Sequence, residues 1–460
     1  MEGPVNRDQR GSGELQDLLD ELREKHGVVG ATLGVLEEGA IETAASGLLN
    51  LETRVECTPQ SVFQIGSIGK IFTTTLIMQL VDEGRLDLDD PVTRYLRDFA
   101  LADRAAARAI TVRHLLNHTS GMDGDFFPAD DPEGPSTASY VRKMWLLPNL
   151  YPPGKGPVTY CNAGFVTAGR IVEVLTGLTW PNAVMARIVR PLGLPHAFAH
   201  PHEALRYRCA MGHVADPGDA TKIGLAPATF LSLSAAAAGS VLSMSVESLL
   251  LFAKAHLAEG HYGEGKRLLS EASARRMREE TTPVPPFARR GITHWGLGWC
   301  LGLKDGYRMI GHDGGTLGHY TYLRIFPDRG TAFALFTNSP SVKLVDAVEE
   351  RLTRELAGVD LPEEPPKTEF APKPRRYVGR YSNIANDYTV EATDGGLVVH
   401  ARSKIGFPDS DAALEPWCED VFTLRAKGNP IDGQKVSFLG DDKSQPAEFI
   451  RAGLRMARRV

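Results

Sequence analysis

The sequence of 460 residues contains no uninterrupted apolar run of about eighteen residues, the length that a membrane-spanning helix requires. Residues Met1 to Gln16 are polar and lack the apolar core of a secretory signal peptide. These two absences predict a chain without a membrane partner. From them we also expect the protein to remain in the cytoplasm.

Cysteine is scarce, with five residues in the whole chain. They are Cys57, Cys161, Cys209, Cys300 and Cys418. None forms a C-x-x-C pair, which argues against a zinc site and against a framework of disulfides. Their odd number suits a reducing compartment. We expect no metal and no other cofactor.

An excess of positive charge is also missing, because 51 Lys and Arg residues are outnumbered by 57 Asp and Glu residues. The net charge of −6 gives no reason to expect nucleic acid as a partner. The basic C-terminal end, Arg451 to Arg459, is a local exception. The apolar share of 42% is that of a globular protein, and the length predicts two or three domains.

The first 360 residues carry the patterns of helices packed on a sheet. Leucines at helical spacing predict an amphipathic helix over Leu15 to Lys25. Pairs of strands joined by tight turns are expected at Gly30–Leu36 with Ile41–Ser46, and at Thr321–Phe326 with Thr331–Thr337. A sheet therefore begins near the N-terminus and is completed by strands much later in the chain.

Two further apolar stretches complete this part of the chain. Leu231 to Leu257 is rich in alanine and leucine and predicts a buried helix. Trp295 to Leu301 predicts one strand of the sheet.

The character of the chain changes after Leu361 to Pro374, a linker that contains five prolines. The strand-like runs beyond it are Tyr377–Tyr381, Tyr388–Ala392, Gly396–Ala401, Val421–Leu424, Val436–Leu439 and Ala447–Arg451. Turns of Gly, Asp and Pro separate them, which predicts a small all-β domain closed into a barrel. We therefore divide the chain into a first domain at 1–360, the linker at 361–374 and a β domain at 375–460.

One stretch of the first domain suggests catalysis. Ser67 lies where a glycine-rich turn meets an apolar helical run, and Lys70 follows one helical turn later. Residues three apart share a helix face, so the amine can reach the hydroxyl. A desolvated lysine is a base, and a serine beside a base is an activated nucleophile. The alternative is a loosened turn into a core helix, with Lys70 extending to solvent.

Two more short motifs accompany this pair. Tyr160 and Asn162 stand two apart where a rigid loop meets a helical run, so both can project into one cleft. His312 and Gly314 stand two apart in a glycine-rich stretch after a predicted strand. Y-x-N recurs at Tyr381, but no helical pattern follows there.

A pair of histidines offers a different possibility. His114 and His118 are four apart, a spacing that places both on one helical face and that could bind a metal. No acidic partner completes a metalloprotease pattern, which favours a structural role for both. Thr111 is expected to cap this short helix.

Taken together, Ser67-x-x-Lys70, Tyr160-x-Asn162 and His312-x-Gly314 resemble the serine β-lactamase and penicillin-binding-protein superfamily in order and spacing. The resemblance is to the branch that contains class C β-lactamases, and His114 to Gly121 is similar to a structural segment of that branch. It implies a β-lactamase-like α/β fold, with an antiparallel sheet beside a helical subdomain, followed by a lipocalin-like barrel.

The same resemblance implies a role for each site residue. Ser67 would be the acylated nucleophile, with Lys70 and Tyr160 sharing the proton transfers. Asn162 would orient the substrate amide, and His312 stands where many relatives have a lysine. Backbone N–H groups of Ser67 and Gly315, next to Gly314, would form the oxyanion hole.

Family members differ in the group that receives the acyl chain from serine. The expected cytosolic location favours the penicillin-binding-protein-type thioesterases, which act on carrier-bound nonribosomal peptides and release macrocycles. There the substrate is a peptidyl ester or thioester, a carrier protein is the partner, and Arg455 could hold the peptide. The alternatives are a small-ester esterase or a D-aminopeptidase, then a true β-lactamase, then a non-catalytic binding protein.

Overall fold

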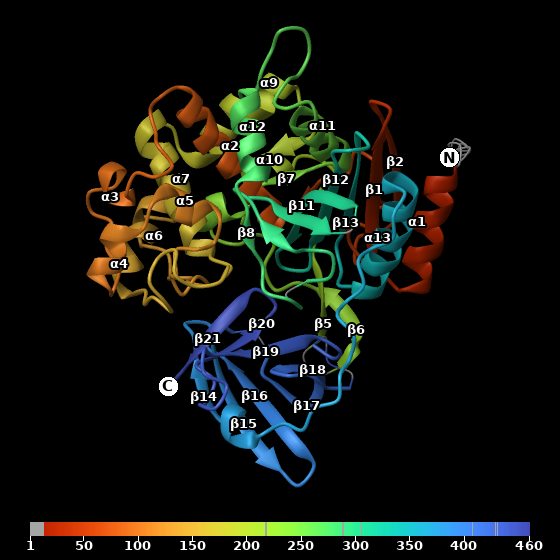
Figure 1. Cartoon of the computed structure of the whole chain (residues 1–460). Coiled ribbons are helices and arrows are strands. Elements are labelled where there is room, and N and C mark those ends of the chain that lie inside the picture. Colours follow the sequence, from red (N-terminus) through yellow and green to blue (C-terminus); the bar gives the residue numbers. More distant parts are fainter. Residues whose placement is uncertain are drawn as a thin grey trace, which may run out of the picture.

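The computed structural model describes residues 13–216, 219–287, 289–304, 306–406, 408–427, 429 and 431–460. Figure 1 shows a larger part that combines helices with a sheet, and a barrel below it that ends at the C-terminus. Within the described residues, no helix is both long and apolar enough to cross a membrane.

The core of the larger part is an antiparallel sheet of eight strands in the order β2-β1-β13-β12-β11-β10-β9-β8. The strands are β1 (Gly30–Glu37), β2 (Ala40–Gly47), β8 (Thr282–Pro283), β9 (His294–Trp295), β10 (Cys300–Lys304), β11 (Tyr307–Gly315), β12 (Tyr320–Phe326) and β13 (Thr331–Thr337). Because β1 pairs with both β2 and β13, the N-terminal hairpin continues the sheet formed by strands from the C-terminal end of this part. Both predicted strand pairs are confirmed.

Helices cover the sheet on both sides. Helix α1 (Glu14–Lys25), the predicted amphipathic helix, packs on β2 and contacts α13 (Val342–Ala357), which packs on β13. Helix α11 (Val246–Leu257) packs on β1 and β13 from the opposite face, and a Cβ on Gly34 would lie 2.7 Å from a Leu250 methyl carbon.

The helical subdomain lies beside the sheet (Figure 1, left). It contains η1 (Gly66–Ile68), α2 (Gly69–Asp82), α3 (Val92–Tyr95), α4 (Arg104–Ala109), α5 (Val112–Leu116), α6 (Thr137–Lys143), η2 (Met144–Leu146), α7 (Asn162–Thr176), α8 (Trp180–Val184), η3 (Met185–Val189), α9 (Arg190–Leu192), α10 (Pro201–Ala204), η4 (Leu233–Ala238) and α12 (Glu271–Glu279). The small strands are β3 (Phe63–Gln64), β4 (Ala197–Phe198), β5 (His213–Asp216), β6 (Asp219–Leu225) and β7 (Ser243–Met244).

Two predictions for this part are wrong in detail. The stretch 231–257 is not one helix, because the chain leaves η4 at Gly239 and re-enters a helix only at α11. Gly239 has φ 109°, and a Cβ there would lie 2.0 Å from the Gly66 carbonyl oxygen, so the chain turns to pass the Ser67 segment. The stretch 295–301 is not one strand: it contains the end of β9, a turn over 296–299 with Gly298 at φ 77°, and the start of β10.

The C-terminal part is a closed eight-stranded antiparallel barrel, which confirms the predicted all-β architecture. Its strands are β14 (Gly379–Ser382), β15 (Asn386–Thr393), β16 (Gly396–Ser403), β17 (Ser410–Cys418), β18 (Val421–Arg425), β19 (Lys435–Leu439), β20 (Phe449–Ala452) and β21 (Arg455–Arg459), preceded by α14 (Pro374–Tyr377). Sequence patterns missed β17 and β21. The basic run 451–459 is thus part of the barrel wall.

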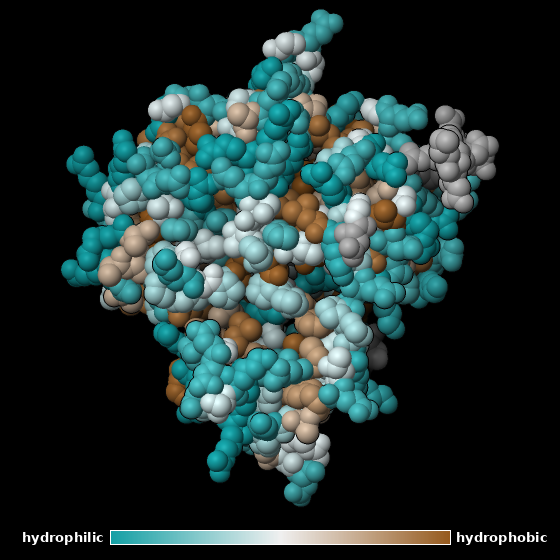
Figure 2. All heavy atoms as spheres, viewed as in Figure 1, coloured by the Kyte–Doolittle hydropathy of each residue, from teal (hydrophilic) through white to brown (hydrophobic). Residues whose placement is uncertain are grey.

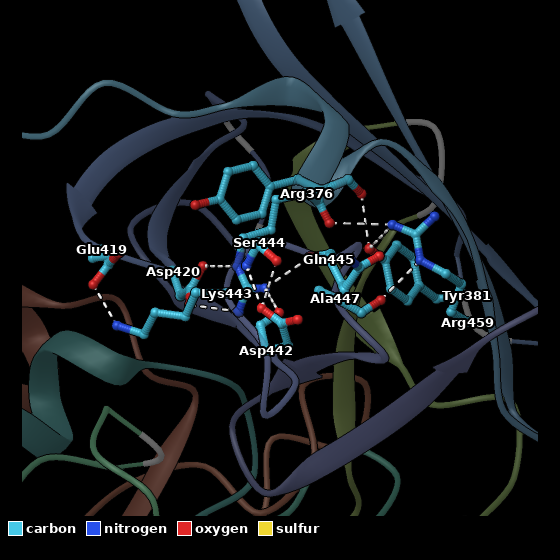
Figure 3. Close-up of polar contacts among 11 residues, drawn as sticks. Arg376, Tyr381, Glu419, Asp420, Asp442, Lys443, Ser444, Gln445, Ala447 and Arg459 are labelled. Atoms are coloured by element: carbon cyan, nitrogen blue, oxygen red, sulfur yellow. Dashed lines mark hydrogen bonds and ion pairs between the residues drawn. The ribbon is translucent and has the colours of Figure 1, made fainter.

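Two arginines tie one end of the barrel together (Figure 3). Arg376 makes a two-pronged ion pair with Asp420, at 2.6 and 2.8 Å, and also donates to the Asp442 and Gln445 carbonyl oxygens. Arg459 donates to the Ala447 carbonyl oxygen at 2.8 Å and to two others nearby. The bonds of Arg459 anchor β21, the strand that faces the larger part.

Figure 2 shows a mainly hydrophilic surface, with hydrophobic residues visible where the barrel meets the larger part. The contact is specific as well as apolar. The Tyr160 N–H donates to the Leu454 carbonyl oxygen (2.8 Å), and the Ile384 N–H donates to the Asp123 carboxylate (2.6 Å). Met456 packs in a cluster with Leu150 and Tyr151. The β20–β21 turn is therefore seated against the loop that carries Tyr160.

Candidate active site

Ser67 lies on η1, and Lys70 lies in the first turn of α2. The Lys70 amine is 3.0 Å from the Ser67 hydroxyl oxygen and donates to the Ala238 carbonyl oxygen at 2.6 Å. The predicted contact between amine and hydroxyl is therefore present. Helix η4 ends at Ala238 because the chain turns at Gly239, and this turn places the Ala238 carbonyl oxygen at the Lys70 amine.

The surroundings of Lys70 favour an unprotonated amine. Its side chain is fully buried, and burial holds the Lys70 pKa well below its usual value, assisted by the positive charge of Arg455. The ring of Tyr160 lies 4.9 Å from the amine. A buried amine with a lowered pKa in contact with a serine hydroxyl is suited to accept its proton, and the alternative of Lys70 extending to solvent is wrong.

Tyr160 lies close to both Ser67 and Lys70. Burial raises the pKa of its phenol, while a hydrogen bond with Ser67 and the charge of Arg455 act in the opposite direction. The phenol is therefore protonated at neutral pH and can donate a proton through Ser67. Together Lys70 and Tyr160 give the serine both a proton acceptor and a proton donor.

Strand β11 approaches the serine segment closely because it lacks side chains there. A Cβ on Gly314 would lie 1.9 Å from the Ile65 carbonyl oxygen, and a Cβ on Gly66 would lie 2.5 Å from the Gly315 nitrogen. The Thr321 hydroxyl, on β12, also donates to the Ile65 carbonyl oxygen at 2.8 Å. The Gly315 N–H is thereby brought beside the turn that carries Ser67, as an oxyanion hole requires.

His312 is a buried, neutral residue at this site. Its Nδ1 donates to the Asp313 carbonyl oxygen at 2.6 Å, so its Nε2 is the unprotonated nitrogen. Burial lowers the His312 pKa to about 4. At neutral pH His312 therefore cannot supply the positive charge that a lysine at this position would.

The two histidines of the predicted helix have different environments. Helix α5 ends at Leu116, and His118 lies beyond it at φ 59°, so His114 and His118 do not share a helical face. His114 accepts from the Thr111 N–H (3.1 Å) and completes the cap of α5. His118 accepts from the Cys161 N–H (3.0 Å), and its ring lies 4.4 Å from that of Tyr160. Both contacts are structural.

Asn162 has a partner that the sequence does not indicate. Its amide nitrogen donates to the Asp125 carboxylate at 2.8 Å, and the same carboxylate forms an ion pair with Arg455 from β21. The guanidinium carbon of Arg455 lies 5.0 Å from the Tyr160 ring centre. Asp125 thus joins α7, the loop before it and the barrel.

The predicted residues therefore gather in one place, and Asp125 and Trp295 join them. Trp295 packs edge-on against Tyr160, His118 and His312 at 4.8 to 5.9 Å between ring centres. Neither was singled out from the sequence, because Asp125 lies in an Asp/Pro/Gly loop and Trp295 in an expected strand. Among the described residues, no three His, Cys, Asp or Glu side chains form a group that could hold a metal.

Comparisons with known proteins agree with this geometry. The family model for β-lactamase matches residues 15–357. The chain is 40% identical over 350 residues to penicillin-binding protein 4 of Amycolatopsis lactamdurans, covering 76% of this chain and 91% of that protein.

Solved structures extend the similarity to the barrel. SurE matches with a TM-score of 0.77 and 30% identity, covering 97% of this chain and 98% of that one. The D-amino acid amidase of Ochrobactrum anthropi SV3 matches with a TM-score of 0.62 and 26% identity, covering 75% of this chain and 97% of that one. The chain belongs to the serine β-lactamase and penicillin-binding-protein superfamily and is a β-lactamase-fold serine hydrolase.

Proposed function

We propose that this enzyme accepts a peptidyl ester or thioester on Ser67 and releases the peptide as a macrocycle. In acylation, Lys70 takes the Ser67 proton, the oxygen bonds to the substrate carbonyl carbon, and the leaving alcohol or thiol receives a proton. In release, the amine of the same peptide attacks the serine ester, and its proton returns to the Ser67 oxygen. The donor would be held by a carrier protein of a peptide synthetase.

The observation that carries the proposal is the position of the barrel. Its β20–β21 turn is hydrogen-bonded to the backbone of Tyr160, and its Arg455 lies over the Tyr160 ring. An enzyme that only hydrolyses small esters gains nothing from such a cover. An enzyme that forms rings must keep water away from the acyl-serine until the peptide amine arrives.

The barrel must favour attack by the peptide amine over attack by water on the acyl-serine. Bulk water is present at about 55 M, whereas a well-placed group in the same molecule reaches an effective molarity of about 10⁵ M or more. If the bound peptide is not held in a conformation that brings its amine to the ester, that advantage is lost, and water hydrolyses the acyl-serine. Arg455 can hold the peptide through its main-chain carbonyl groups, since neither bond to Asp125 uses Nη1.

The nucleophile is tested first. A fluorophosphonate or an activated ester should give one adduct on intact-mass analysis, and peptide mapping should place it on Ser67. The Ser67→Ala variant should give none. An adduct that persists in this variant would assign the nucleophile elsewhere.

The product is tested second, with a linear peptide thioester whose C-terminal residue has the D configuration. We expect the full-length protein to give cyclic peptide, and a chain truncated after Pro362 to give mainly linear acid while still being acylated by a small ester. Liquid chromatography with mass detection measures the partition, and Arg455→Ala should shift it in the same direction. Only linear acid from the full-length protein would reject the cyclase.

The second candidate is a hydrolase that acts on D-aminoacyl amides or esters. It is favoured by the similarity to a D-amino acid amidase, which covers the larger part of the chain without the barrel. Under this alternative, rapid turnover of D-aminoacyl amides would accompany linear acid from every thioester.

A further inference from the structure

Few positive charges at this site are free to attract an anionic substrate. The Arg455 guanidinium carbon lies 5.0 Å from the Tyr160 ring centre, and its Nε and Nη2 both donate to the Asp125 carboxylate. Arg289 and Arg324 both pair with Asp313, at 2.6 and 2.7 Å. Lys404, on the barrel, pairs with Asp387 at 2.7 Å. Each of these cations is already matched by a carboxylate.

The remaining basic groups do not replace them. His312 is neutral at neutral pH, because burial lowers its pKa to about 4. Lys70 is fully buried and already donates to the Ala238 carbonyl oxygen at 2.6 Å, and burial holds its pKa well below its usual value. A substrate carboxylate would therefore find no uncompensated charge at any of these groups.

We propose that Asp125 determines specificity by excluding substrates whose leaving group carries a free carboxylate. Its own carboxylate occupies the Nε/Nη2 face of the Arg455 guanidinium and compensates its charge, so a substrate carboxylate that reached the remaining Nη1 would lie beside a negative charge. The inference deepens the proposed acyl-serine reaction and rests on it. It selects carrier-bound thioesters, esters and amides over peptides that end in a free D-amino acid.

A second group, the side chain of Asn162, also holds the Asp125 carboxylate in position. Asn162, on α7, donates to Asp125 Oδ1 at 2.8 Å, so the carboxylate is held between a helix and the barrel. The Asp125 side chain is 13% exposed, whereas that of Arg455 is 48% exposed. The carboxylate is thus the less exposed, anchored partner, and the guanidinium still presents Nη1 to neutral carbonyl groups of a substrate.

The chemical step is the same for either kind of leaving group. The Ser67 oxygen bonds to the acyl carbon, the carbon–nitrogen bond to the leaving residue breaks, and the proton from Ser67 passes to the leaving amine. Only the charge at the far end of that residue differs. Asp125 therefore acts on binding of the leaving residue and not on the proton transfer.

The test uses two peptides that differ in a single group, N-acetyl-D-Phe-D-Ala and its C-terminal amide N-acetyl-D-Phe-D-Ala-NH₂. They compete in one mixture, and mass detection gives the ratio of their kcat/KM values. We expect the native enzyme to favour the amide. Asp125→Asn, which keeps an acceptor for Asn162, should shift the ratio towards the acid by roughly tenfold or more, the scale of a new charge-assisted hydrogen bond.

Two further variants make the result decisive. Arg455→Gln leaves the Asp125 charge unpaired and should shift the ratio further towards the amide, while the double variant should lie near the native ratio. Binding of both peptides to the same variants in a Ser67→Ala background repeats the comparison without chemistry. Opposite shifts in binding that cancel in the double variant support the role of Asp125 even if neither peptide is turned over. Ratios unchanged within twofold overturn it.

Discussion

Replacing Lys70 with methionine should disable the enzyme and stabilise its fold. The amine is fully buried, touches Ser67 Oγ at 3.0 Å and donates to the Ala238 carbonyl oxygen at 2.6 Å. Without a proton acceptor, acylation by a small activated ester should fall by about two to four orders of magnitude. Methionine has a similar volume and no charge, so the packing should survive.

The stability change follows from two opposing contributions. Methionine leaves the Ala238 carbonyl without its donor, a loss of about 1–3 kcal/mol. It also removes an amine whose charged form costs several kcal/mol to bury. We therefore expect the free energy of unfolding at pH 7 to rise by about 1 kcal/mol or more, as is common when a catalytic group is removed.

The pH dependence gives a sharper check. Because the Lys70 pKa is lowered in the folded protein, the unfolded chain binds a proton that the folded protein lacks at pH values between the folded pKa and the usual 10.5. The free energy of unfolding of the native protein therefore rises with pH across that window, whereas that of the methionine variant lacks this rise. Its advantage in thermal unfolding should shrink from pH 7 to pH 9.5. An advantage that stays constant from pH 7 to pH 9.5 would mean that the folded amine keeps its proton over that range, which would refute the reasoning.

Three further predictions concern neighbouring groups. Tyr160→Phe should lower turnover by about two to four orders of magnitude with little change in the melting temperature, and native rates of acylation and deacylation would make Tyr160 merely structural. Burial, followed by the charge of Asp125, raises the Asp123 pKa to about 7. The folded protein then holds a proton that the unfolded chain has lost, so stability should fall as pH rises from about 4 to about 7, and Asp123→Asn should remove that slope in melting curves. His114→Ala should lower the melting temperature because the cap of α5 loses its Thr111 N–H contact, and a selective loss of turnover at full stability would contradict that reading.

The sequence by itself determined the features that depend on near neighbours or on simple periods. The contact between Ser67 and Lys70 is predicted from local spacing alone, because residues three apart on a helix are neighbours. The hairpins at β1–β2 and β12–β13 follow from alternating strands and short turns. The order of the three short motifs indicated the β-lactamase superfamily and, with it, the fold of the larger part.

Tertiary structure alone decided the charges and partners of the site. Asp125 and Arg455 are 330 residues apart, and neither a pattern nor a propensity relates them. The neutral state of His312 depends on burial among rings from separate segments, because desolvation is a property of the packed site. Strand β21 was not predicted, because its basic sequence lacks a strand pattern. Its residues form a strand by pairing with β14 and β20. Local sequence specifies which atoms react, whereas their protonation and their access to substrate depend on distant segments that pack around them.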